Sequence, residues 1–387
     1  MRIRLLALLA AVALPLYAFE SWTLYQQEVG SVGADYWEIQ RHRIQGTDAV
    51  PYYAPMARYV RAGSTLDVAG TPSVPLFSIA TKFSVLCREG DRPFATFTAD
   101  RYGFNNPDAI WDQPIDIVTL GDSFTVGACV ASQDHSVGLV RNAFPRLANL
   151  GVSGSGPIMQ IAILREFVQA IRPKLVVWFY DEHNDVFTYN ARPEAADIAI
   201  EHAHPILGRY LSEPSFRQDV LANMQAFQSA LARDVERSID GIRKNTLIRN
   251  ANAALRFLAL TQTRHRLGIG TLSAAEEDVR LRLFRQAMPM MAAEAHAVGA
   301  KLVVVKLPSN GALCNQARDP LANEVEDIIR INADGYLDLE ADMRAAVGSG
   351  KEAALFALNC GGHYSETGYR IVGQRTTDWL RQTLQGQ

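Results

Sequence analysis

The sequence has few cysteines, little net charge and a single long hydrophobic run. Four cysteines among 387 residues are too few for a disulfide scaffold, although they allow one or two bridges. A formal net charge of −3 argues against a protein whose main task is to bind nucleic acid. A mean hydropathy of −0.04 excludes a protein with many membrane spans. The remaining composition, 48% hydrophobic and 20% charged, is that of a folded globular chain.

The long apolar run lies at the N-terminus. Arg2 and Arg4 precede residues 5–19, which are apolar almost without interruption. This layout is typical of a secretory signal, and the run is shorter than the ~20 residues that span a bilayer comfortably. We predict that residues 1–19 are a signal peptide or an N-terminal membrane anchor. The chain is then exported, either to a bacterial periplasm or to the outer face of the inner membrane.

A change of pattern near residue 115 divides the chain. Residues 20–110 are rich in aromatic residues, proline and glycine, and we expect an irregular N-terminal extension packed on the core. Short apolar runs then predict buried strands at residues 115–120, 147–150, 175–180, 301–307 and 335–339. Helical periodicity covers residues 158–171, 275–298 and 366–382.

Strands that alternate with helices predict a parallel sheet with helices on both faces. The fold class is therefore α/β, a three-layer α/β/α arrangement that occupies residues 111–387. Residues of about 190–272 are polar and helical in pattern, and we interpret them as a helical insertion after the third strand.

Polar residues follow the predicted strands, where such sheets bind ligands. Ser123 follows the first strand on a tight turn into a helix, where a developing negative charge is stabilised. Gly154 follows the second strand and Asn184 the third, and His363 precedes the closing helix. Together they supply a nucleophile, a backbone donor, an amide donor and a general base, which are the parts of an acyl-transfer site.

Two acids flank these positions. We expect Asp122 and Asp185 to fix loop geometry through backbone N–H bonds rather than to do chemistry. No cofactor and no metal is implied, since His202 and His204 have no further ligand cluster near them in the sequence. The glycine-flanked Gly-x-Ser-x-Gly turn of the α/β-hydrolases is absent, which disfavours that fold.

At these residues the sequence resembles the SGNH (GDSL-type) hydrolases. The matching blocks are Gly-Asp-Ser-Phe-Thr with Ser123, Asn-Leu-Gly-Val-Ser-Gly with Gly154, His-Asn-Asp with Asn184, and His363. The resemblance spans roughly residues 115–187 and 300–383. It implies a flavodoxin-like sheet, a nucleophilic Ser123 and a basic His363. It also implies an oxyanion hole formed by the Ser123 N–H, the Gly154 N–H and the Asn184 amide.

A finer resemblance concerns the type of substrate. Phe124-Thr125 in place of a leucine, together with residues 97–105, is similar to exported members linked to bacterial polysaccharides. Those members include relatives of alginate O-acetylation proteins. This similarity implies an acylated carbohydrate or polysaccharide as the substrate.

The carboxylate that orients the histidine is missing from its usual place. The family usually carries aspartate three residues before the histidine, and related acetylation proteins carry it two before. Here those positions are Cys360 and Gly361. A backbone carbonyl could orient His363, a carboxylate from elsewhere such as Asp338 could substitute, or the site could be degraded and only bind glycan. We favour a working serine–histidine dyad, since such pairs retain part of their rate.

The four cysteines offer a structural substitute for this carboxylate. Cys314 follows the fourth predicted strand and Cys360 precedes His363, so a Cys314–Cys360 bridge would pin the histidine loop. Cys87 and Cys129 then pair by elimination. Export makes both bridges chemically allowed.

We therefore predict a serine-dependent acyl-ester hydrolase or O-acetyltransferase that acts on a carbohydrate ester outside the cytoplasm. The alternative is a non-catalytic carbohydrate-binding or polysaccharide-assembly protein with a degraded site. A lipid esterase ranks third. Besides its substrate, the chain is expected to meet a membrane surface only through its N-terminus, and to bind no nucleic acid.

Overall fold

The centre of the molecule is a five-stranded parallel sheet in the order β11-β10-β9-β7-β8. The structure, a computed structural model, describes residues 13–21, 31–33, 35–181, 185–186, 196–239, 278–314 and 320–385. The strands are β7 (Ile117–Leu120), β8 (Leu147–Asn149), β9 (Leu175–Asp181), β10 (Lys301–Leu307) and β11 (Gly335–Asp338). All five predicted strands are confirmed.

The strand order locates the ligand-binding edge of the sheet. Counted along the chain, the five strands are arranged 2-1-3-4-5, which is the flavodoxin-like order. From β7 the chain adds β8 on one side of the sheet and then adds β9, β10 and β11 on the other side, so the switch point lies between β7 and β9. In sheets of this kind ligands bind outside the carboxyl ends of the two strands at that switch point. The residues after Leu120 and Asp181 are therefore at the expected site.

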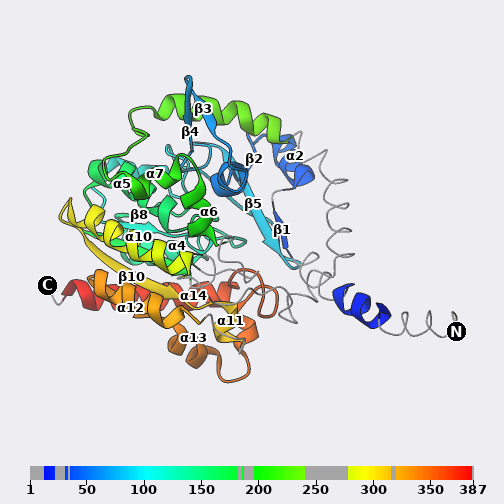
Figure 1. Cartoon of the computed structure of the whole chain (residues 1–387). Helices are drawn as coiled ribbons and strands as arrows, with labels where there is room; N and C mark the ends of the chain where they lie inside the picture. Colours follow the sequence, from blue (N-terminus) through cyan, green and yellow to red (C-terminus); the bar gives the residue numbers. More distant parts are fainter. Residues whose placement is uncertain are drawn as a thin grey trace, which may run out of the picture.

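Helices cover both faces of the sheet (Figure 1), and they pack against side chains that alternate between the two faces along each strand. One face packs Val118, Leu120, Val176, Trp178, Leu302 and Val304 with α5 (Pro157–Ile171), α10 (Val279–His296) and α12 (Ala322–Asn332). The other packs Ile117, Val177, Phe179, Val303 and Val305 with α4 (Ser136–Ala143), α13 (Glu340–Val347) and α14 (Glu366–Gln385). The three-layer α/β/α class is confirmed, and α5, α10 and α14 match the predicted helices.

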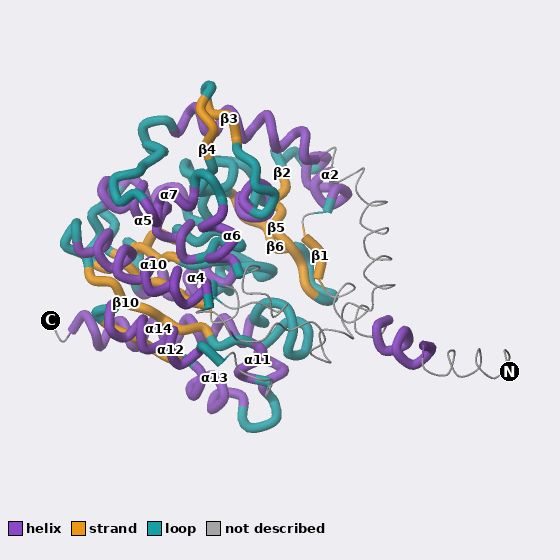
Figure 2. The backbone as a smooth tube through the Cα atoms, in the orientation of Figure 1, coloured by secondary structure: helices purple, strands orange, loops and turns teal. Residues whose placement is uncertain are grey.

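The N-terminal region forms a second, smaller sheet around β5 (Phe83–Glu89), seen in Figure 2 beside the main body. β6 (Ala95–Thr98) pairs antiparallel along one edge of β5. β1 (Ser31–Gly33) and β2 (Val50–Pro51) pair with β5 along its other edge, β1 antiparallel and β2 parallel. A short hairpin of β3 (Leu66–Val68) and β4 (Thr71–Ser73), the helix α2 (Tyr36–Ile44), the one-turn η1 (Met56–Val60) and η2 (Asp108–Asp112) complete this region.

Aromatic side chains join the N-terminal region to the main domain. Phe77 and Phe104 lie edge-on to Phe167 of α5, with ring centroids 6.3 Å and 5.3 Å away. All three rings are buried in the hydrophobic cluster that also contains Val118 and Leu120 of the sheet. The N-terminal region therefore shares one core with the α5 side of the domain.

The described part of the predicted insertion is helical. It contains α6 (Asp197–Ala203), α7 (Leu207–Ser212) and a helix over residues 224–239, while residues 240–277 lie outside the described residues. Short helices α3 (Ser123–Val126), α11 (Asn310–Leu313) and η4 (Glu352–Leu355) lie in loops of the main domain. Residues 13–21, which include the end of the predicted signal or anchor at residue 19, are also helical. Over the described ranges, no helix has the length and apolar character needed to cross a membrane.

Candidate active site

Ser123 lies at the switch point, on the turn between β7 and α3. Gly121 before it has φ +144°, and a Cβ there would collide with Thr125 Oγ1 and lie 2.7 Å from Phe179 O. Only glycine therefore fits this turn. Asp122 caps α3 by accepting the Phe124 N–H at 2.9 Å, and its other oxygen lies 3.4 Å from Ser123 Oγ. The turn thus presents Ser123 at the first residue of a helix.

His363 meets Ser123 although 240 positions separate them. The distance from His363 Nε2 to Ser123 Oγ is 2.9 Å. The His363 loop is fixed by the Ala357 N–H, which donates to His363 O at 2.9 Å, and by the bridge between Phe356 and Tyr364. The ring of Phe124, the residue after the serine, lies 5.0 Å from the imidazole and packs against it. The hydroxyl and the predicted base are thus in hydrogen-bonding contact.

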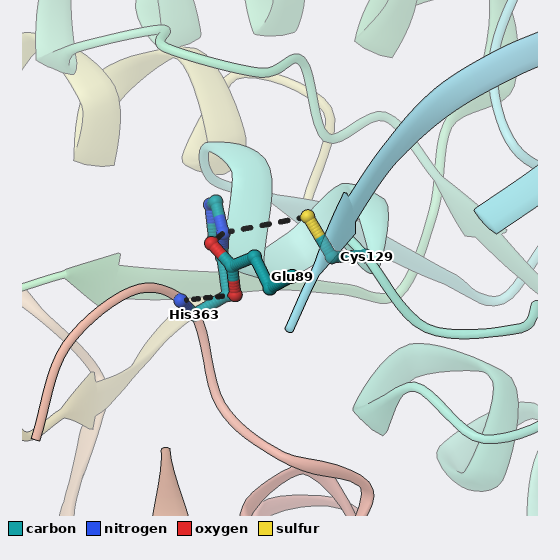
Figure 3. Close-up of side chains that lie close together, drawn as sticks. All are labelled: Glu89, Cys129 and His363. Carbon is teal, nitrogen blue, oxygen red and sulfur yellow. Dashed lines mark hydrogen bonds and ion pairs between the residues drawn. The ribbon is translucent and has the colours of Figure 1, made fainter. Parts of the chain in front are cut away.

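The carboxylate beside His363 is Glu89, which no sequence argument singled out. Glu89 Oε1 lies 2.9 Å from His363 Nδ1, and Glu89 Oε2 accepts the His363 backbone N–H at 2.9 Å. The Glu89 side chain is only 1% exposed, and Figure 3 shows it reaching His363 from the β5 side. Ser123, His363 and Glu89 thus form a chain of contacts with the geometry of a catalytic triad.

Asp338, offered as a substitute carboxylate, does not occupy this position. Its Oδ2 lies 3.2 Å from Lys306 Nζ on the neighbouring strand, and its Oδ1 accepts the Glu340 N–H at the start of α13. The suggestion of Asp338 is therefore corrected to Glu89. A backbone carbonyl is not needed either, because Glu89 faces Nδ1.

The charges of the pair are mutually stabilising. Burial alone would raise the pKa of the Glu89 carboxyl, but its hydrogen bonds and ion pair with His363 outweigh burial and hold that pKa below its usual range. Burial likewise favours neutral His363, and the Glu89 carboxylate, helped by Asp122, outweighs it and raises the pKa of His363. Glu89 therefore makes the imidazole a stronger base.

Both predicted disulfides are present, Cys87–Cys129 and Cys314–Cys360. Cys87 lies on β5 two residues before Glu89, and side chains two apart on a strand point to the same face. The predicted pairing of Cys87 with Cys129, close after Ser123, was thus a signal that could have led to Glu89.

Cys129 Sγ lies 3.8 Å from His363 Nδ1. Although Glu89, Cys129 and His363 cluster within 4.8 Å, the bridged sulfur offers no thiolate to a metal.

The loop with Gly154 is tied to the serine turn. Gly121 O accepts hydrogen bonds from the Val152 N–H at 3.0 Å and from Ser155 Oγ at 3.1 Å. Gly154 itself has φ +76°. In the part of the chain that the structure describes, neither the Ser123 N–H nor the Gly154 N–H has a hydrogen-bond acceptor. Backbone donors without an acceptor are suited to stabilise an oxyanion.

The third predicted donor, Asn184, lies outside the described residues, as does His183. The neighbouring Asp185 is described and fully buried. It accepts the Asp181 N–H at 3.0 Å and a Gln160 Nε2–H at 3.1 Å, which ties the end of β9 to α5. Burial, reinforced by the nearby carboxylates of Asp122 and Asp181, raises the pKa of Asp185 well above its usual value.

The N-terminal region also covers the Gly154 loop. Tyr52 OH accepts the Ser153 N–H at 3.2 Å. A Cβ placed on Gly154 would lie 3.4 Å from Met56 Cβ. The N-terminal region thus contributes Tyr52 and Met56 to the surroundings of the Gly154 loop, and Glu89 to the surroundings of His363.

Comparisons with known proteins gave distant structural matches only. No family model and no curated protein matches the chain. One solved structure, from Desulfitobacterium hafniense DCB-2, is described as a lipolytic protein of the G-D-S-L family; it matches over 68% of this chain and 98% of its own, with 12% identity and a TM-score of 0.34. An acylhydrolase structure from Bacteroides fragilis NCTC 9343 matches over 71% and 93%, with 14% identity and a TM-score of 0.35. Similarity this distant carries no functional argument, so function is inferred from the sheet order and the side-chain geometry.

Proposed function

We propose that the protein is a serine-dependent acyl-ester hydrolase or O-acyltransferase. The observation that carries this proposal is the 2.9 Å contact between Ser123 Oγ and His363 Nε2 at the switch point of the sheet. A site that only bound a ligand would need neither this contact nor a buried carboxylate behind the imidazole. The alternative of a degraded, purely binding site is therefore disfavoured.

The reaction follows from the arrangement of the atoms. Ser123 Oγ attacks the ester carbonyl carbon while its proton passes to His363 Nε2. The carbonyl oxygen becomes an oxyanion that the Ser123 and Gly154 N–H groups and the predicted Asn184 amide would stabilise. The C–O bond to the alcohol then breaks, and His363 returns its proton to the leaving oxygen. An acyl group is left on Ser123.

The second half of the reaction decides the enzyme class. Water that loses its proton to His363 and attacks the acyl-serine yields a free acid, so the protein is an esterase. A sugar hydroxyl that attacks in the same way yields a new ester, so the protein is an acyltransferase. In both cases Ser123 regains its proton and the cycle closes.

We propose an acylated carbohydrate or polysaccharide outside the cytoplasm as the substrate. Two disulfides are consistent with an oxidising compartment. The positively charged and then apolar N-terminus is typical of export. An O-acyl group on an exported glycan is an ester, which is the bond that the proposed reaction cleaves or forms.

Turnover of p-nitrophenyl acetate by the full chain tests the proposal. We expect Ser123→Ala and His363→Ala each to lower kcat/KM by about 10³-fold or more, because either change removes the attacking group or its base. Ser212→Ala, at the exposed end of α7, is the matched control and should keep the wild-type rate. Equal rates in all four proteins would contradict the proposal. Adding a chito- or manno-oligosaccharide and measuring acyl-sugar by mass separates transfer from hydrolysis.

A further inference from the structure

We propose that Glu89, supplied by the N-terminal region, is the positioning residue of His363 and that the Cys87–Cys129 disulfide holds it there. The inference rests on the proposed function, since it concerns the base of that reaction. It assigns a role to a residue that lies 274 positions from the histidine and outside all four matching sequence blocks.

The carboxylate of Glu89 contacts His363 at two points. Oε1 faces the imidazole Nδ1 and Oε2 accepts the backbone N–H of the same residue, each at 2.9 Å. An ionised carboxylate only accepts hydrogen bonds, so Nδ1 must carry the proton. In neutral His363 the free lone pair is then on Nε2, which faces Ser123 Oγ. Glu89 thereby selects the tautomer that a general base requires.

The histidine loop is shaped to fit this carboxylate. Gly362 has φ +69°, and a Cβ there would lie 2.7 Å from both Glu89 oxygens. Only glycine lets the loop come this close. A carboxylate that is 1% exposed is costly to bury without partners, and the backbone N–H and Nδ1 of His363 are both partners of Glu89. The fit therefore serves the Glu89–His363 contact.

The disulfide fixes the strand that carries Glu89 to the segment that carries Ser123. Cys87 is two residues before Glu89 on β5, and Cys129 follows Ser123 by six residues. The cross-link lies against the imidazole, since Cys129 Sγ is 3.8 Å from Nδ1 (Figure 3). The other disulfide, Cys314–Cys360, holds the histidine loop instead. One cross-link thus ties the Glu89 strand to the Ser123 segment, and the other ties the His363 loop to the segment after β10.

The first test is the pH dependence of kcat/KM for Glu89→Gln and Glu89→Asp. The amide of glutamine can donate to an unprotonated Nδ1, which moves the proton to Nε2 and blocks the base. We expect a loss of about 10²–10⁴-fold. Losing the negative charge lowers the pKa of His363. The acidic limb of the pH profile, where kcat/KM falls because His363 becomes protonated, should therefore move to lower pH. Glu89→Asp keeps the charge and should keep the limb nearer its wild-type position. Glu213→Gln, exposed at the end of α7, is the control and should change neither value.

The second test asks whether the disulfide acts through Glu89. Cys87→Ala/Cys129→Ala should lower kcat/KM and move the acidic limb in the same direction as Glu89→Gln. In the Glu89→Gln background the same cysteine changes should cost much less, because the contact they protect is already gone. If the cysteine changes lower kcat/KM by the same factor in the wild-type and Glu89→Gln backgrounds, the disulfide does not act through Glu89 and its proposed role is wrong.

Two outcomes separate this inference from the proposed function. If Ser123→Ala abolishes turnover but Glu89→Gln keeps the wild-type rate and pH profile, the role of Glu89 is wrong and the esterase proposal stands. If Ser123→Ala keeps full activity, the proposed function is wrong. An NMR titration of the His363 ring, assigned by its loss in His363→Ala, then still measures whether Glu89→Gln lowers the histidine pKa. An unchanged titration would overturn the pairing itself.

Discussion

Gly121 shows how a single position sets the geometry of the nucleophile. Its φ of +144° lies in the region that favours glycine. The missing Cβ also leaves room for Thr125 Oγ1 and Phe179 O. Ser123 Oγ reaches His363 only because β7 can turn this sharply into α3. The motif Gly-Asp-Ser is thus a backbone requirement as much as a chemical one.

Gly121→Ala should therefore lose both stability and activity. We expect a loss in the free energy of unfolding of more than about 2 kcal/mol, since backbone strain and a steric collision add. Gly46→Ala is the matched control, because Gly46 has φ +88° but no atom within 4 Å of an added Cβ. Urea denaturation followed by circular dichroism measures the stability of both variants, and turnover of p-nitrophenyl acetate measures their activity. Equal losses for the two variants would contradict the collision.

The helix α5 illustrates how one element is completed by another. Its N-cap, Gly156, has no side chain to satisfy the first N–H groups of the helix. Glu201 of α6 does so instead, with Oε1 accepting from Gly156 N at 2.6 Å and Oε2 from Ile158 N at 2.9 Å. The insertion thereby stabilises the helix that follows the Gly154 loop.

The capping carboxyl also makes stability depend on pH. Burial, with a contribution from Asp197, raises the pKa of Glu201 to about 8. The unfolded chain releases this proton near the ordinary value of 4.5, so between those values the folded state binds more protons. The free energy of unfolding should then fall as pH rises through this window.

Glu201→Gln removes that ionisation and should flatten this part of the pH dependence. Urea midpoints at several values from pH 5 to pH 8, compared between the two proteins, measure the effect. Glu213→Gln, whose carboxylate is exposed, serves as the control and should keep the wild-type slope. A wild-type slope in Glu201→Gln as well would contradict the raised pKa of Glu201.

The whole molecule depends on a core shared between the N-terminal region and the main domain. Phe167 of α5 contacts Phe77 and Phe104 from the N-terminal side of the chain. Glu89 of β5 is delivered to His363 by the same docked region. Loosening this core should therefore affect catalysis as well as stability.

Phe167→Ala should cost about 3–5 kcal/mol of unfolding free energy, because it opens a cavity between the two regions. It should also lower kcat/KM while Ser123 and its turn stay in place. Phe144→Ala, a partly buried phenylalanine packed on the opposite face of the sheet, is the control and should not reduce activity beyond its smaller effect on stability. Turnover and calorimetry on the same samples give both readings. A wild-type kcat/KM in folded Phe167→Ala would contradict the coupling.

Much of the domain could be predicted from local patterns. The five buried strands appear as short apolar runs, and the turn residues after Leu120 and Leu150 appear as glycine-rich motifs. Ser123 was identifiable because the carboxyl edge of a parallel sheet gathers polar residues that follow its strands, and His363 because it directly precedes the closing helix. Four cysteines permit three full pairings, and the pairing that the structure shows was a hypothesis from their positions beside the site. The role of Asn184 and the carbohydrate substrate stay predictions.

The amino-acid sequence by itself determined the strands, the serine turn and the histidine before the last helix, since these depend on periodicity and on residues close together in the chain. Only the tertiary structure decided which carboxylate faces His363. Asp338 is on the central sheet yet contacts Lys306, whereas Glu89 comes from a separate small sheet. The physical reason is that a contact across 274 positions is set by how β5 docks and by the Cys87–Cys129 cross-link, and no local pattern encodes that docking.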